Sequence, residues 1–276
     1  MRLRIIYRDA FSIGGKQVHN YIRTTLTMPQ MIPPASDDDY RKSHQQRGGT
    51  YDATLAASPF DAYMAQLERQ YLREIVPSLF PHKKPRYLDF ACGTGRITET
   101  VSPLCAEAIG VDISASMLAE ARSKCPSVKF IETDLTKSKI DLGTFDLATS
   151  FRFFGNAQQD LRIAVLQALH RALGPKAYLI INSHRNPRSL AMLFNAVTGG
   201  GDQGMDLHFP KLKRLLHSCG FEIVQSRPIG FWMYRHKLME FADAESPRDQ
   251  RRESMFKSMI FTPFAPDAVV VARKLS

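Results

Sequence analysis

The sequence has 276 residues, of which 44% are hydrophobic and 23% are charged, and its formal net charge is +10 at pH 7. A chain of this length and composition can bury a full core, which favours one large domain or one domain with appendages. Its apolar runs are too short to cross a bilayer, and the basic amino-terminal residues lack the apolar stretch of a secretory signal. We therefore expect a cytoplasmic protein without a membrane span.

The cysteines and the charge narrow the range of partners. No CxxC pair occurs, which argues against a structural zinc knuckle and a disulfide framework, so we expect reduced thiols, mostly in the core, and no metal. The positive charge permits an acidic partner, but the basic residues are scattered and no arginine-rich arm occurs. Nucleic-acid binding is therefore the less favoured alternative. The four cysteines are Cys92, Cys105, Cys125 and Cys219.

The first fifty residues are poorly patterned. Residues 28–49, MPQMIPPASDDDYRKSHQQRGG, carry the proline, aspartate and glycine that are typical of a loop. We expect residues 1–50 to form a partly irregular arm and residues 51–276 a single domain, with cover segments near 51–80, 186–210 and 229–262. A helix is predicted from Ser58, because a capping serine and a proline precede an apolar stripe at helical spacing. The stripe consists of Tyr63, Leu67, Tyr71 and Ile75.

Strand-like and helix-like segments alternate from residue 87 onward. This alternation predicts a doubly wound parallel sheet with helices on both faces. A later helix ends at Gly220 and is followed by a strand, and DAVVVARK, residues 267–274, reads as another strand. The expected strands are 87–91, 106–113, 128–134, 145–151 and 177–184, and the expected helices between them are 95–105, 115–125 and 160–173.

A glycine turn follows the first of these strands, in YLDFACGTGR, residues 87–96. Gly93 and Gly95 allow a tight bend and let a ligand approach the free N–H groups at the start of the next helix. A dinucleotide fingerprint would need a third glycine at position 98, which is Thr98, and no GK[ST] ending of a phosphate loop occurs. We infer that the ligand is not held by phosphates, and that Asp89 at the strand end attracts a cationic group.

Two further acids end the next two strands. Asp112 lies 23 residues after Asp89, close to the interval at which an acid reaches the ribose hydroxyls in such sheets. Asp134 ends the following strand and is placed to accept a hydrogen bond from an exocyclic amine. Three acids without a phosphate loop suit a nucleoside that carries a positively charged amino-acid tail, which describes S-adenosyl-L-methionine.

Four segments, YLDFACGTGR, IGVDISASMLAEAR, FIETDL and FDLATSF, occur in this order and resemble the first four motifs of class I S-adenosylmethionine-dependent methyltransferases. The resemblance covers about residues 50–184, and LHSCGFEIVQS and DAVVVARK are similar to the last helix and strands of the same fold. It implies a Rossmann-like sheet of seven strands, mostly parallel with an antiparallel last strand, with a helical cover before it and an insertion near its end.

The resemblance also implies roles for individual residues. Asp89, Ala91, Gly93 and Gly95 would line the methionine part of the cofactor, and Asp112 would bind the ribose. Ala91 stands where many members have a glycine. The remaining cofactor residues would be Tyr51 over the carboxylate, Ile113, Met117, Asp134 and Leu135 at the adenine, and Ser150 and Phe151 closing the pocket.

The acceptor side is open to several interpretations. His184 follows a strand at the edge where open α/β folds place substrates, and an imidazole can remove a proton near neutral pH. The alternative is a histidine that packs or only contacts substrate. Phe151, Phe153 and Phe154 would floor a pocket or belong to the core. Polar candidates to orient an acceptor on the same rim are Arg152, Asn156, Asn182 and Arg185.

The reaction expected from these features is methyl transfer to a small-molecule or glycan acceptor, at a hydroxyl or carboxyl oxygen. The segment TSFRFFGN lacks the [DN]PP[YF] box that stacks a flipped adenine or a glutamine amide, and no run of acids suggests a metal site. The alternatives are N-methylation of a metabolite or peptide, an RNA methyltransferase, and a non-catalytic cofactor-binding subunit. A homodimer is possible.

Overall fold

The computed structural model describes residues 11–13, 16–18, 48–138, 140–198, 206–233 and 242–275. Side chains are described from Asp52 onward within these ranges, except Thr54 and residues 195–198. The chain forms two compact units, residues 1–34 and 35–276. The first contains an antiparallel hairpin of β1 (Phe11–Ile13) and β2 (Lys16–Val18). The expected loop at 28–49 lies outside the described residues up to residue 47.

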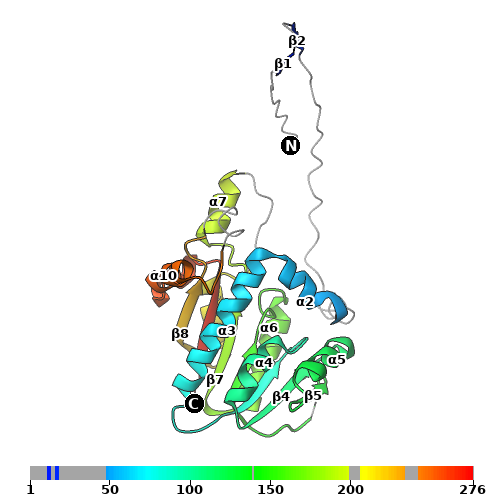
Figure 1. Cartoon of the computed structure of the whole chain (residues 1–276). Coiled ribbons are helices and arrows are strands. Elements are labelled where there is room, and N and C mark those ends of the chain that lie inside the picture. Colours follow the sequence, from blue (N-terminus) through cyan, green and yellow to red (C-terminus); the bar gives the residue numbers. More distant parts are fainter. Residues whose placement is uncertain are drawn as a thin grey trace. The chain divides into compact units, whose positions relative to one another are not determined.

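The second unit is built on one seven-stranded sheet with the order β5-β4-β3-β6-β7-β9-β8. Neighbouring strands from β5 to β7 are parallel, and β9 is antiparallel to β7 and to β8, which confirms the predicted fold class (Figure 1). The strands are β3 (Arg86–Phe90), β4 (Glu107–Asp112), β5 (Lys129–Glu132), β6 (Phe145–Ser150), β7 (Leu173–Ser183), β8 (Phe221–Ile229) and β9 (Asp267–Lys274).

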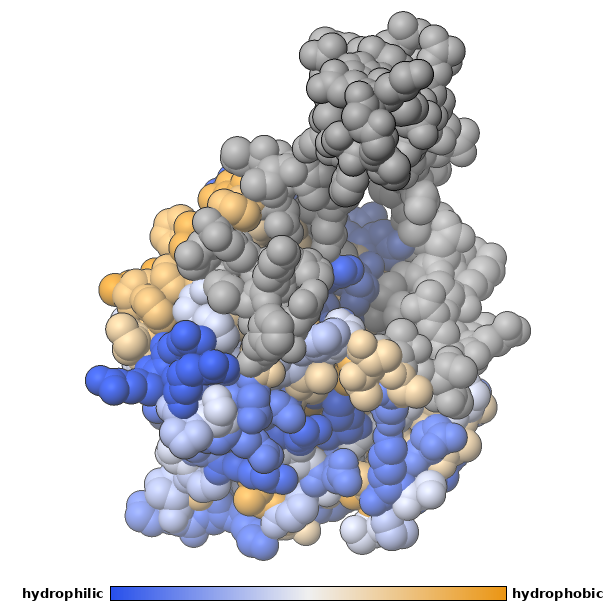
Figure 2. All heavy atoms as spheres, turned by 45° about the horizontal axis from the view of Figure 1, so that its top comes forward, coloured by the Kyte–Doolittle hydropathy of each residue, from blue (hydrophilic) through white to orange (hydrophobic). Residues whose placement is uncertain are grey.

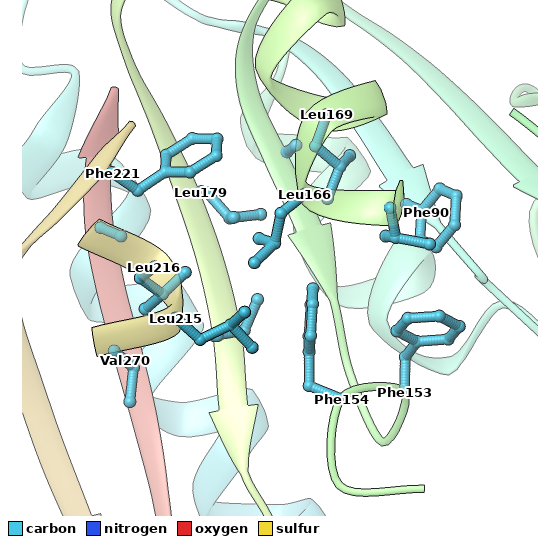
Figure 3. Close-up of a cluster of buried hydrophobic side chains, with 14 of the residues drawn as sticks. Phe90, Phe153, Phe154, Leu166, Leu169, Leu179, Leu215, Leu216, Phe221 and Val270 are labelled. Atoms are coloured by element: carbon cyan, nitrogen blue, oxygen red, sulfur yellow. The ribbon is translucent and has the colours of Figure 1, made fainter. Parts of the chain in front are cut away.

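Helices cover both faces of this sheet. Helices α6 (Gln159–Ala172) and α8 (Phe209–Ser218) pack their apolar residues into one core, where Leu166, Leu215 and Phe221 are buried (Figure 3). Helices α3 (Pro59–Leu79) and α4 (Arg96–Val101) contribute to a second core with β3 and β9. Helix α5 (Ala115–Lys124) closes a third, smaller cluster against β5. The sheet is therefore buried on both sides, as its long apolar strands require.

Helix α3 forms as the sequence predicts. The side chain of Ser58 accepts from the backbone N–H of Asp61 at 3.3 Å and caps the helix, and Pro59 occupies its first turn. All four residues of the predicted apolar stripe are at most 4% exposed. The helix is thus fixed against the sheet, and its first turn is held at the edge where the parallel strands end.

Three α-helices in the described part of the chain are not in the sequence-based prediction. Helix α2 (Gly48–Ala57) begins with two glycines, which are poor helix formers, so the expected arm and the domain meet inside a helix. Helix α7 (Leu190–Thr198) lies in an expected cover segment. Helix α10 (Pro247–Met255) lies in another expected cover segment, and no helix was predicted there although Ser246 caps it and Pro247 opens it, the same signals that predicted α3.

Polar side chains cover most of the described surface shown in Figure 2, and apolar ones gather in a few patches. None of the helices in the described ranges is long and apolar enough to span a membrane. All four cysteines are free, and three are buried, in agreement with the expectation of reduced core thiols. The large apolar side chains that are exposed among the described residues are Ile140, Leu190, Leu193, Val224, Met255, Met259, Ile260 and Phe264.

Candidate functional site

The glycine turn after β3 has the bent backbone that its sequence predicts. Gly93 and Gly95 have φ angles of 54° and 80°, in the left-handed region that favours glycine. A Cβ at Gly95 would lie 3.1 Å from the Cβ of Ala121, so α5 also packs too closely for a side chain there. Ala91 has φ of 54° as well. This conformation explains in physical terms why glycine suits position 91, and why alanine there is strained.

Thr98 occupies the position of the missing third glycine, and it has a structural role. Its hydroxyl donates to Oδ2 of Asp89 at 2.5 Å, and the hydroxyl of Thr149 donates to Oδ1 at 2.7 Å. Asp89 is 1% exposed, and burial raises the pKa of this carboxyl to about 6. The acid is therefore anchored at the end of β3 in the wall of the site.

Asp112 connects the glycine turn to the end of β4. Its Oδ2 accepts from the backbone N–H of Gly93 at 2.8 Å, and its Oδ1 accepts from that of Ser114 at 2.9 Å. Each carboxylate oxygen can accept more than one hydrogen bond. The geometry thus fixes the carboxylate and leaves it capable of accepting from a pair of hydroxyl groups.

A cavity of about 650 Å³ lies at this edge of the sheet. Its volume is in the range of small-molecule sites. Most of the predicted cofactor residues lie in its wall, and so do four predicted acceptor-side residues. From the cofactor side these are Asp89, Ala91, Gly93, Asp112, Ile113, Met117, Asp134 and Phe151, and from the acceptor side Arg152, Asn156, His184 and Arg185.

Other predicted residues do not lie in the cavity wall. Gly95 packs behind the turn, Leu135 packs against the core, and Ser150 is fully buried in β6. Asn182 is 1% exposed and lies in β7. Its side chain is hydrogen-bonded to the backbone N–H of Arg152 and to Glu68. The backbone of Tyr51 belongs to α2, but its side chain lies outside the described residues.

Helix α2 is tied directly to the glycine turn. Asp52 accepts a hydrogen bond from the hydroxyl of Thr94 at 2.8 Å and forms an ion pair with Lys124. Lys124 also donates to the backbone oxygen of Thr94 at 3.1 Å. Leu55 of the same helix lies in the cavity wall. The first helix of the domain therefore covers the cavity beside the turn.

Arg152 is the best-anchored residue on the acceptor side. Its backbone N–H donates to Oδ1 of Asn182 at 2.7 Å, and its backbone oxygen accepts from Nδ2 of Asn156 at 2.6 Å. Its Nη1 forms an ion pair with Oδ1 of Asp61 at 2.5 Å. The φ angle of Arg152 is 58°, so a non-glycine residue is held in a strained conformation at the end of β6.

His184 lies between Asp267 and Arg152. Its Nδ1 is 2.8 Å from Oδ2 of Asp267, and its Nε2 is 3.4 Å from Nη1 of Arg152. Because the guanidinium can only donate, Nε2 is the accepting nitrogen and Nδ1 carries the proton. Burial and the neighbouring Arg152 lower the pKa of His184 to about 3. The imidazole is therefore neutral near pH 7 and a weak base, which argues against the predicted role as a general base.

Three acids of this region are absent from the sequence-based prediction. Glu68 of α3 is fully buried, forms an ion pair with Arg96 at 2.8 Å, and accepts from Nδ2 of Asn182 at 2.9 Å. Burial alone would raise the pKa of Glu68, but Arg96 and Arg152 hold it below its usual value. The other two are Asp61 and Asp267. Glu68 could have been singled out from the sequence, because it is an acid next to Leu67 on the apolar side of a predicted helix.

Comparisons with known proteins agree with this geometry. The methyltransferase domain family matches residues 88–176. A demethylmenaquinone methyltransferase of Chlorobaculum tepidum is 27% identical over 169 residues, which cover 60% of this chain and 68% of that one. A ubiquinone/menaquinone biosynthesis C-methyltransferase of Coxiella burnetii is 30% identical over 111 residues, which cover 37% of this chain and 44% of that one. The chain thus spans less than half of the latter relative.

A solved structure shares the fold over most of its length. Magnesium protoporphyrin IX methyltransferase of Synechocystis, solved with bound S-adenosylhomocysteine, superposes with a TM-score of 0.60 at 15% identity. The match covers 87% of this chain and all of that one. The chain is a class I methyltransferase with a Rossmann-like fold. It uses S-adenosyl-L-methionine as its methyl donor.

The donor set in the cavity fits this cofactor. Asp112 offers two fixed carboxylate oxygens for a ribose, and the left-handed turn brings backbone close to the space where an amino-acid tail would lie. The anchored Asp89 and the side chain of Asp134 supply further acceptors in the same wall. Within the described ranges no group of three or more histidine, cysteine or acidic side chains could hold a metal ion.

Proposed function

We propose that this methyltransferase acts on an oxygen atom of a small molecule bound in the cavity beside Arg152 and His184. The observation that carries the proposal is the continuity of the cavity: Asp112 and Asp134 line it together with Arg152, Asn156 and His184. Donor and acceptor would then lie in one enclosed space, as in-line displacement requires. When bound, the cofactor supplies the electrophilic methyl group, and the chain aligns the acceptor and excludes water.

Because His184 is a weak base, we expect an acceptor atom that does not need the protein to remove a proton from it. A carboxyl oxygen or an acidic hydroxyl meets this condition near pH 7, whereas an aliphatic amine is mostly protonated there. The side chains of Phe151 and Phe153 lie in the cavity wall, and they suit an acceptor molecule that is flat or largely apolar. We therefore favour an acidic oxygen over nitrogen as the methylated atom.

A second candidate is carbon methylation of a quinone-like ring. It is supported by the relatives from Chlorobaculum tepidum and Coxiella burnetii, which are a demethylmenaquinone methyltransferase and a ubiquinone/menaquinone biosynthesis C-methyltransferase. Phe151 and Phe153 would also suit such a ring. The nature of the product separates the two candidates, because a methyl ester or methyl ether carries the new methyl group on oxygen and a ring-methylated product carries it on carbon.

The test is a transfer assay with S-adenosylmethionine labelled in its methyl group. Pools of small carboxylic acids, phenols, quinols, amines, glycans and transfer RNA are offered separately, and labelled products are identified by mass spectrometry. We expect label in an acidic small molecule, and much less of it with the Asp112→Ala protein when the cofactor is below saturation. Label that enters only RNA, amines or glycans would contradict the proposal. Label in a base-stable ring carbon would favour the second candidate.

A further inference from the structure

Arg152 uses only part of its hydrogen-bonding capacity. Its Nη1 is engaged by Asp61 and lies near Nε2 of His184. Its Nε and Nη2 are buried and have no hydrogen-bond partner in the described part of the chain. The side chain as a whole is 9% exposed. A buried donor without a partner costs about 1 to 3 kcal/mol, so this arrangement indicates that a partner is supplied by something the protein binds.

The two unpartnered nitrogens lie on the same edge of the guanidinium. Nε and Nη2 point their N–H bonds in parallel, and this edge matches the two oxygens of a carboxylate or a phosphate. Arg152 also lies in the wall of the cavity, at the end of β6 on the acceptor side. Neither nitrogen is accessible to solvent in this structure, so an anionic group at this end of the cavity reaches that edge when the side chains over it shift.

The protein holds this arginine in place before any ligand arrives. Asn182 and Asn156 bond its backbone N–H and oxygen, Asp61 fixes Nη1, and the strained φ of 58° is maintained by these contacts. Burial would lower the pKa of Arg152, but Glu68, Asp267 and Asp61 outweigh it and keep the pKa above its usual value. The cation is thus permanent and pre-oriented, which is the condition for binding an anion tightly.

The charge of the cavity disfavours an anion that carries two charges. Four aspartates line the cavity, against three arginines, so each further negative charge of a ligand meets repulsion. A carboxylate brings one negative charge and two coplanar oxygens, whereas a phosphate monoester brings up to two charges. The aspartates are Asp61, Asp89, Asp112 and Asp134, and the arginines are Arg96, Arg152 and Arg185.

We propose, on the basis of the proposed function, that the Nε–Nη2 edge of Arg152 is the docking site for a carboxylate carried by the acceptor. The docked carboxylate is an anchor: both of its oxygens accept hydrogen bonds from the guanidinium and lose nucleophilicity. Methyl transfer then takes place at another oxygen of the same molecule. The acceptor class is therefore a small organic acid with a second oxygen function.

The probes for this site are benzoate and its neutral amide, benzamide. Binding of each is measured by calorimetry to the full chain saturated with S-adenosylhomocysteine, so that the cofactor's own carboxylate is already in place. We expect benzoate to bind at least about tenfold more tightly than benzamide, since a charged bidentate pair is replaced by a neutral one. In Arg152→Lys, which keeps the charge and loses the flat fork, we expect this preference to fall severalfold. The matched control is Arg251→Lys, a change at an exposed arginine of α10.

Each outcome supports or overturns the proposal. Equal affinity of the wild type for benzoate and benzamide, or an unchanged preference in a folded Arg152→Lys protein, overturns it. If Arg152→Lys weakens S-adenosylhomocysteine but not 5′-methylthioadenosine, the edge serves the cofactor's amino-acid tail, and the acceptor site is refuted. If the variant does not fold, a crystal of the wild type with S-adenosylhomocysteine and benzoate decides by the position of the carboxylate. Failure of the wild type to bind S-adenosylhomocysteine would instead refute the proposed function.

Discussion

The backbone N–H of Gly93 donates to Oδ2 of Asp112 at 2.8 Å, so the glycine turn after β3 and the acid at the end of β4 form one unit. The acid holds the turn in its left-handed conformation, and we propose that it also binds the ribose of the cofactor. Removal of the carboxylate is therefore expected both to weaken cofactor binding and to loosen the glycine turn.

Asp112→Ala is expected to weaken the binding of S-adenosylhomocysteine by about ten- to a hundredfold, because hydrogen bonds to a charged group contribute about 1.5 to 3 kcal/mol. Calorimetry measures the affinity, and the melting temperature reports the loosening of the turn. Glu120→Ala removes an exposed acid from the neighbouring α5 and serves as the control. Unchanged affinity in Asp112→Ala would refute the assignment of this residue.

The turn predicts opposite responses at two small residues. Ala91→Gly relieves a left-handed alanine, and we expect a protein as stable as the wild type or more stable by up to about 1 kcal/mol. Gly95→Ala introduces a Cβ at φ of 80°, 3.1 Å from the Cβ of Ala121, and is expected to lower the free energy of unfolding by more than about 1 kcal/mol. Urea denaturation measures both. Equal effects of the two changes would contradict this description of the turn.

His184→Gln tests the role of the imidazole. Since the pKa of His184 is lowered to about 3, its charge does not change between pH 5 and 9, and we expect no titration of this residue in the pH profile of kcat/KM. We expect KM for the acceptor to rise, because a neighbour of Arg152 is altered, while kcat falls by less than about tenfold. A general base would contribute about 10² to 10⁴ in rate. A loss of that size in kcat would restore His184 as the base.

Glu253 links α10 to α3 and predicts a pH-dependent stability. It accepts from the hydroxyl of Tyr63 at 2.9 Å and from Nε1 of Trp232 at 2.8 Å, and its carboxylate also accepts from the backbone N–H of Gly230. Burial raises the pKa of Glu253 from 4.5 to about 7. The folded state therefore binds this proton more firmly than the unfolded state, and its stabilisation is complete below pH 4.5 and lost as pH rises toward 7.

Glu253→Gln removes this dependence. The difference in the free energy of unfolding between wild type and variant should fall by up to about 3 kcal/mol from pH 4.5 to 7. Urea denaturation at several pH values measures this difference, and titrations common to both proteins cancel. The neighbouring charges on α10 are Asp249 and Arg252, which stacks over Trp232, and both remain in the variant. A pH-independent difference would show that the carboxyl does not titrate in this range.

The strands and the cofactor-side acids could be predicted because each depends on a short stretch of sequence. Apolar runs defined the strands, and Asp89, Asp112 and Asp134 were found from their positions at strand ends. Helix α10 was missed although Ser246 and Pro247 carry its start signal, because its middle is polar and arginine-rich. The sequence therefore predicted a helix where a capping signal was followed by apolar residues at helical spacing, as in α3, and missed one where those residues are polar, as in α10.

The acceptor side could not be predicted in detail because its contacts join distant segments. Asn182 was expected to bind substrate. In the structure its side chain accepts from the backbone N–H of Arg152 and donates to Glu68, which is 114 residues away along the chain. Asp267 was recognised only as the start of a strand. Its contact with His184 joins residues that are 83 positions apart, and no local pattern shows which side chains meet across β7 and β9.

The position of β9 has a consequence for synthesis of the protein. This strand inserts between β7 and β8, although both precede it along the chain, and it brings Asp267 to His184. A nascent chain that has not yet released residues 267–274 from the ribosome has a gap inside its sheet and an imidazole without its carboxylate. Messages interrupted before this point would yield polypeptides in which β7 has an unpaired edge and β8 has no partner strand, and such strands are natural targets for chaperones and proteases.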